Sequence, residues 1–164
     1  MGYLARFSLA IVAGLILHPG FACAAEPGLA GRWATFDTDG RRRAIVEIVD
    51  RGEKATGRIV ELFLNPGEGS DPVCADCAGD ARGRSIRGLE ILELNRENGS
   101  ARWHGTVLDP EEGGLYRCTA HLSPDGRTLF LRGFIGIEAL GRTDSWMRVD
   151  PQGGISRPST ASPW

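Results

Sequence analysis

The sequence has 164 residues, of which 41% are hydrophobic and 24% charged, and its formal net charge is -2. This composition is typical of a globular chain, and the length fits one domain that can bury a substantial core. The sequence lacks the strongly basic balance of a nucleic-acid-binding domain, so we expect no nucleic-acid partner.

The first 25 residues have the pattern of a signal peptide. Arg6 provides the basic start, residues 7–17 form an apolar run, and residues 22–24 fit the small-residue cleavage site. We expect cleavage after Ala24 or Ala25, and therefore a periplasmic or secreted protein. The apolar run has about half of the roughly 20 residues that a spanning helix needs, and no comparable run follows it. The sequence therefore predicts no transmembrane segment.

Residues 26–150 are expected to form one β-barrel domain. Turn signals recur at short, regular intervals, and the runs between them favour aliphatic, aromatic and β-branched residues, as in antiparallel sandwiches and barrels. Turn pairs such as Asp39-Gly40 and Asp125-Gly126 tolerate positive φ and favour hairpins between neighbouring strands. The sequence predicts an all-β fold, a single eight-stranded antiparallel up-and-down barrel. We expect its strands at Gly31–Phe36, Arg43–Asp50, Ala55–Phe63, Leu89–Asn95, Ala101–Leu108, Leu115–Leu122, Thr128–Phe134 and Asp144–Val149.

Side-chain alternation separates an inner from an outer face in only some of these strands. Along residues 115–122, Tyr116 and Cys118 share the face that we expect to point inward. The runs at 43–50 and 128–134 are apolar on both faces, so alternation leaves their directions open. The basic run at residues 41–43 is interpreted as a solvated hairpin entrance.

One long loop and one polar tail interrupt this pattern. The loop at residues 65–88 is rich in Gly, Pro and charged residues and contains Cys74 and Cys77. A loop of this length in a compact domain is often functional, so we expect it to matter for activity. Residues 151–164 are rich in Pro, Gly, Ser and Thr, and we expect a disordered tail.

A series of motifs in a fixed order resembles a known family. The motifs are Gly31-Arg-Trp33, Ile45-Val-Glu-Ile48, Gly57-Arg-Ile59, Asp71-Pro-Val-Cys74-x-x-Cys77, Gly88-Leu-Glu-Ile91, Trp103-x-Gly105, Leu108-Asp-Pro110, Tyr116-x-Cys118, Arg132-Gly-Phe-Ile-Gly136 and Leu140-Gly-Arg-Thr143 followed by Trp146. They resemble the secreted bacterial family catalogued as domain of unknown function 2147. That resemblance implies an exported, lipocalin-like β-barrel and no established activity.

A second resemblance concerns the end of the barrel. Gly31-x-Trp33 together with Arg142 resembles the lipocalin arrangement in which a Trp of the first strand packs under an Arg from the far end of the chain. The resemblance implies that Trp33 and Arg142 form a structural plug.

The cysteines allow several arrangements. Cys23 leaves with the signal peptide unless it becomes a lipid-modified N-terminus, although Gly20 stands where the lipidation motif usually has Leu. Cys74, Cys77 and Cys118 then remain, and an oxidising compartment favours one disulfide among them. A bond between Cys74 and Cys77 closes only a very short loop, whereas a bond from either to Cys118 would fasten the long loop to the barrel. The sequence leaves the pairing open.

Two other uses compete for these thiols. A redox Cys-x-x-Cys centre usually places its first thiol at a helix N-terminus, a setting that is missing around Cys74. A zinc site needs four ligands, so Cys74, Cys77 and Cys118 would have to be completed by His104 or His121. No second Cys-x-x-Cys or closely spaced His pair is present. We therefore expect no cofactor, with zinc as the alternative.

The function expected from these features is non-catalytic. No nucleophile elbow or triad spacing indicates an enzyme. We expect a barrel that binds one small apolar or amphipathic molecule, or a structural barrel filled by its own side chains. The alternatives are a redox or metal-binding envelope protein, and an envelope protein that binds a partner through its tail and barrel edge. Aromatic residues expected to line the ligand site are Trp33, Tyr116, Phe130, Phe134 and Trp146.

Overall fold

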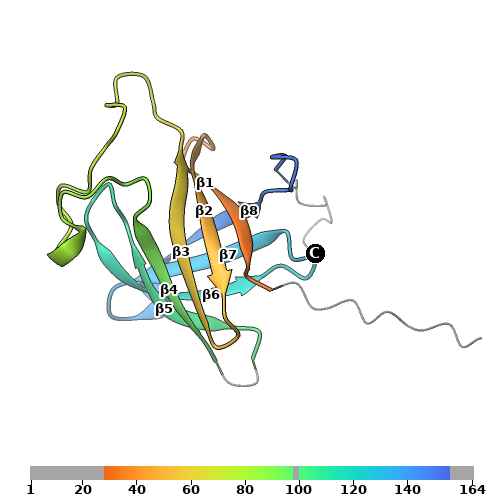
Figure 1. The fold of residues 1–164 in the computed structure, drawn as a ribbon. Coiled ribbons are helices and arrows are strands. Elements are labelled where there is room, and N and C mark those ends of the chain that lie inside the picture. Colours follow the sequence, from red (N-terminus) through yellow and green to blue (C-terminus); the bar gives the residue numbers. More distant parts are fainter. Residues whose placement is uncertain (1–27, 98–99, 156–164) are drawn as a thin grey trace, which may run out of the picture.

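Eight antiparallel strands close into a barrel in sequence order, each paired with the next and the last with the first (Figure 1). This computed structural model describes residues 28–97 and 100–155. The predicted all-β fold, an eight-stranded antiparallel up-and-down barrel, is confirmed. The elements are β1 (Gly31–Phe36), β2 (Arg42–Asp50), β3 (Lys54–Leu62), a 3-10 turn η1 (Gly79–Ala81), β4 (Glu90–Arg96), β5 (Trp103–Leu108), β6 (Leu115–Leu122), β7 (Thr128–Phe134), a 3-10 turn η2 (Glu138–Leu140) and β8 (Arg142–Arg148).

The seam between β1 and β8 is the shortest strand pairing in the barrel. It has two register pairs, Trp33 with Arg148 and Ala34 with Met147. Every other neighbouring pair of strands has at least five such pairs. The seam places the end of β8 directly beside the start of β1.

The packed core fills one end of the barrel. Trp33 and Leu129 are fully buried there, and Trp103 is 3% exposed. On β2, Val46 and Ile48 belong to the core cluster while Val49 is 46% exposed, which settles the direction that alternation left open. Cys118 is 1% exposed, so its predicted inward direction is confirmed.

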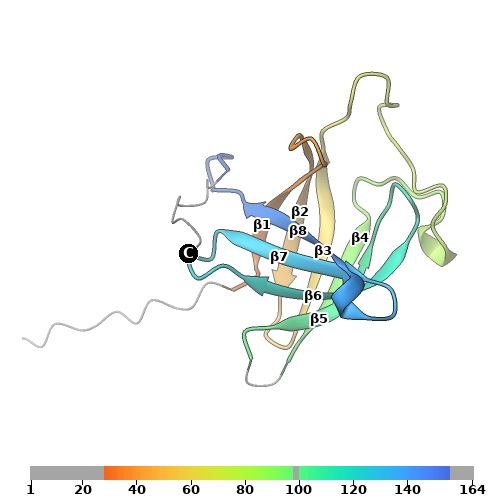
Figure 2. The ribbon, with the colours of Figure 1, turned by 180° about the vertical axis from the view of Figure 1, so that it is seen from behind.

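Residues 63–89 form a lobe at the opposite end of the barrel, named here the β3–β4 lobe. Figure 2 shows it beside the turn between β5 and β6. Cys74 and Cys77 form a disulfide inside this lobe, and both are fully buried in the core cluster. A bridge between Val73 and Ser85 folds the lobe back on itself. The disulfide therefore stabilises the lobe internally and leaves Cys118 as a free thiol.

Several expectations concern residues that the structure does not describe. The signal peptide, both cleavage positions and Cys23 lie outside the described residues, as do residues 156–164 of the tail. The first part of the tail turns back on the chain just after β8, where Ile155 forms a bridge with Val149. Across residues 28–97 and 100–155, no helix is long and apolar enough to cross a membrane.

Candidate functional site

A cavity of about 1080 Å³ occupies the end of the barrel that the packed core leaves open. Its inner wall is apolar and includes Val46, Ile59, Ile91, Leu131 and Trp146. These side chains come from five different strands because inward-facing positions alternate along each strand of a barrel. The volume slightly exceeds the usual range for small-molecule sites, about 300–1,000 Å³. The arrangement can enclose an apolar group against a rigid wall.

Arg43 crosses the mouth of this cavity and joins three segments of the chain. From β2, its side chain donates from Nη1 and Nη2 to the two carboxylate oxygens of Glu68 in the β3–β4 lobe, at 3.1 and 3.0 Å. Nη2 and Nε also donate to Oε1 of Glu111 in the β5–β6 turn, at 2.7 and 3.3 Å. Nη1 also donates to the Phe63 carbonyl at 3.4 Å. The Arg43 side chain is only 19% exposed, so the expected solvated position is wrong for this member of the basic run.

The hydrogen-bonded charges of Arg43 and Glu68 shift the pKa of each other toward the ionised form. Hydrogen bonds from Arg43, followed by the Asn65 backbone N–H, lower the pKa of Glu68 to about 2. The same cluster raises the pKa of Arg43, with the Glu68 hydrogen bond as the largest cause and that of Glu111 next. Arg43 and Glu68 therefore stay ionised over the physiological pH range.

Backbone packing also connects the β3–β4 lobe to the β5–β6 turn. Gly113 has a φ of 72°, and a Cβ there would collide with the backbone of Asp76 and Cys77. Only Gly combines this left-handed conformation with so close an approach. The disulfide loop and the β5–β6 turn thus form one side of the cavity mouth.

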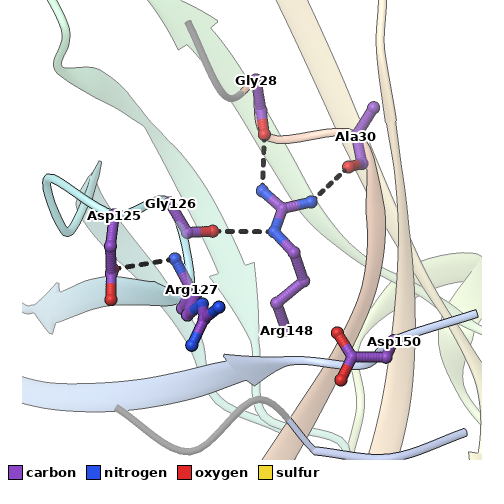
Figure 3. A pocket seen from close by; sticks show the side chains of 7 residues that line it. All are labelled: Gly28, Ala30, Asp125, Gly126, Arg127, Arg148 and Asp150. Carbon is purple, nitrogen blue, oxygen red and sulfur yellow. Dashed lines mark hydrogen bonds between the residues drawn. The ribbon is translucent and has the colours of Figure 1, made fainter. Parts of the chain in front are cut away.

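Arg148 closes the other end of the barrel, beside a small pocket of about 340 Å³ (Figure 3). It donates to the carbonyls of Gly28, Ala30 and Gly126 at 2.8, 2.8 and 2.7 Å. Its guanidinium carbon lies 4.2 Å from the centroid of the Trp33 ring. Burial lowers the pKa of Arg148.

The plug that was expected from Trp33 and Arg142 is therefore formed with a different arginine. Arg142 lies at the start of β8, six positions before Arg148, and its 74% exposed side chain comes within 4.0 Å of Asp144. Antiparallel pairing sets the end of β8, and hence Arg148, beside Trp33. The arginine at the end of the last strand was the available signal, because antiparallel closure joins that end to the start of the first strand.

Of the aromatic residues that were expected to line the ligand site, two line the cavity and three lie elsewhere. Tyr116 and Trp146 line the cavity. Trp33 lies in the closed end, where its Nε1 donates to the Leu29 carbonyl at 2.9 Å. Phe130 stacks on the exposed His121, and Phe134 lies under Arg117, so neither lines the cavity. Both faces of β7 are apolar, so side-chain alternation did not show which of its residues face the cavity.

The thiols are not arranged as an open reactive site or a metal site. Both disulfide sulfurs belong to fully buried residues, and thiol exchange requires access by an attacking thiolate. Burial raises the pKa of Cys118 to about 12. His104 and His121 are exposed, and within the described part of the chain no group of three or more His, Cys, Asp or Glu residues could hold a metal ion.

Comparison with known proteins identifies the family. Residues 31–148 match the bacterial family described as "Uncharacterized protein conserved in bacteria (DUF2147)". The chain belongs to the DUF2147 family. The match runs from the first residue of β1 to the last of β8, so the DUF2147 unit is the barrel itself. No curated protein sequence matches the chain.

A solved structure shares the fold of this DUF2147 protein. It is a protein from Helicobacter pylori, HP1028, described as belonging to the lipocalin family. The TM-score is 0.62 at 16% sequence identity, and the match covers 80% of this chain and 92% of the other. At this identity the likeness establishes a common lipocalin-like barrel.

Proposed function

We propose that this DUF2147 protein is an exported, non-catalytic carrier that holds one small apolar or amphipathic molecule inside its barrel. The observation that carries the proposal is the cavity of about 1080 Å³ with its apolar inner wall. A barrel with a purely structural role can be filled by its own side chains, as the closed end of this one is. The buried disulfide supports export, because such bonds persist in oxidising compartments.

Tyr116 and Trp146 are the aromatic residues that we assign to the ligand. Trp146 is 5% exposed, and its neighbours in the cavity wall include Leu131 and Met147. Tyr116 lies nearer the mouth, where its hydroxyl is 3.5 Å from a Glu112 carboxylate oxygen. An apolar tail would thus contact Trp146, and a polar head group would lie near Tyr116.

The test is binding of Nile red, an uncharged apolar dye, with and without a residue that blocks the cavity. Gly133 lines the cavity, and a Cβ there would lie 3.7 Å from Tyr116 Cβ and 3.8 Å from Val107 Cγ1, which are ordinary contact distances. Gly133→Phe therefore adds a ring to the cavity. Val49→Phe adds the same group at a position that is 46% exposed and does not line the cavity, and it serves as the control.

The wild-type protein and Val49→Phe are expected to bind one dye molecule with a blue-shifted emission. Gly133→Phe is expected to weaken binding about tenfold or more, since a ring in the cavity removes the space for the dye. Equal dye affinity in Gly133→Phe and the wild type would contradict binding inside the barrel.

A further inference from the structure

The charged residues that line the cavity are predominantly acidic. Among the residues that the structure describes, two of those lining the cavity are cationic, Arg43 and Arg142, and none is Lys or His. Six are acidic, which with the two arginines gives the lining a formal charge of -4. The acidic residues are Asp37, Glu68, Asp109, Glu111, Glu112 and Asp144.

Arg43 has no donor left for an anionic ligand. A guanidinium has five N–H groups. Those of Arg43 are used in five hydrogen bonds, two to Glu68, two to Glu111 and one to the Phe63 carbonyl. The more buried cation of the mouth therefore neutralises protein carboxylates instead of attracting a ligand anion.

Arg142 does little to offset the negative charge of the cavity lining. Its side chain is 74% exposed, and its Nε lies 4.0 Å from Oδ1 of Asp144, so the charge is shared with solvent and a carboxylate. An exposed guanidinium of this kind contributes little to ion pairing.

The acidic side chains of two turns are held in place at the mouth. Asp37 accepts hydrogen bonds from the backbone N–H groups of Asp39 and Arg41. Asp109 accepts them from the backbone N–H groups of Glu111 and Glu112. These backbone hydrogen bonds fix the direction of both carboxylates at the mouth.

We propose that the cavity selects amphipathic molecules with a cationic or uncharged head group and disfavours those with a carboxylate or phosphate head group. This inference rests on the proposed carrier function and gives the chemical class of its ligand. The apolar wall takes the tail, and the acidic mouth takes the head. Tyr116 adds an aromatic ring near which a cationic head group is further stabilised.

The experiment compares three ligands with the same ten-carbon tail, namely decyltrimethylammonium, decanol and decanoate. Each displaces Nile red from the wild-type protein below its micelle concentration, at about 20 mM and about 500 mM salt. At low salt, decyltrimethylammonium is expected to bind about tenfold tighter than decanoate, with decanol between them. High salt should reduce the difference because it screens exposed charges.

A double variant tests whether the mouth causes the selection. Glu112→Gln with Asp144→Asn removes two negative charges from the cavity lining, and it is expected to narrow the difference between the ammonium and the carboxylate ligand. Asp80→Asn removes an exposed carboxylate of η1 that does not line the cavity, and it should leave the difference unchanged.

The outcomes separate this inference from the carrier function. Decanoate binding as tightly as decyltrimethylammonium to the wild type would overturn the charge selection and leave the carrier function standing. Absence of binding by Nile red and all three ligands would overturn both.

Discussion

Replacing Arg148 with Met is predicted to destabilise the protein far more than the same change at Arg142. Arg148→Met retains an unbranched apolar side chain over Trp33 but removes the charge and three hydrogen bonds to backbone carbonyls. The Gly126 carbonyl belongs to a buried residue, whereas Gly28 and Ala30 are exposed and can bond to water instead. We therefore count one full charged hydrogen bond, two weak ones and the cation–π contact, together about 3 kcal/mol.

This loss should be visible as a change in the unfolding midpoint. For a domain of this size, about 3 kcal/mol corresponds to a decrease in Tm of roughly 10 °C. Arg142→Met removes one ion pair at 4.0 Å from a side chain that is 74% exposed, and its cost should stay below about 0.5 kcal/mol. Thermal unfolding followed by circular dichroism measures both variants. Equal Tm values for the two variants would refute the assignment of Arg148 as the residue that closes the barrel.

Two further predictions concern ionisation. Because the Glu68 pKa is about 2 in the folded protein against an ordinary 4.5, its ion pair with Arg43 stabilises the fold above pH 4.5 and loses this effect as the pH falls toward 2. Glu68→Gln should therefore have a lower Tm than the wild type at neutral pH, and a difference that persisted undiminished at pH 2 would contradict the ion pair. The pKa of Cys118 is about 12 and its residue is 1% exposed, so iodoacetamide at pH 8 should leave it unmodified in the native protein. After unfolding in guanidinium, the same reagent should alkylate it. Rapid alkylation of the native protein, measured by mass spectrometry, would show that the thiol is accessible.

The strands could be predicted because their signals are local. Leu115–Leu122 and Thr128–Phe134 are found with the expected bounds, since turn residues border them directly. Pairing between sequence neighbours then follows from short hairpin connections everywhere except between β3 and β4, which the β3–β4 lobe connects. The barrel therefore emerges from information that lies within a few residues of each turn.

The features that the sequence did not reveal depend on long-range register. Arg142 and Arg148 are an even number of positions apart on one strand, so alternation alone gives them the same face, and only the antiparallel closure of the barrel shows which one meets Trp33. That choice depends on the pairing of β1 with β8. Similarly, Arg43 meets Glu68 and Glu111 across 25 and 68 positions of sequence. No periodic pattern connects residues so far apart.

The short seam between β1 and β8 also has consequences for how the barrel forms and opens. All other strand pairings join neighbours in sequence, six of them through short connections and β3–β4 through the β3–β4 lobe, whereas the seam joins the two ends of the domain. Closing so long a loop has the largest entropic cost, so the seam is the step of assembly with the highest contact order. In the native state, the contacts of Arg148 with Ala30 and Trp33 add to the two register pairs of the seam, so loss of Arg148 is expected to speed amide exchange there. The barrel is thus a continuous sheet of seven sequential pairings whose closure depends on one short, non-local contact.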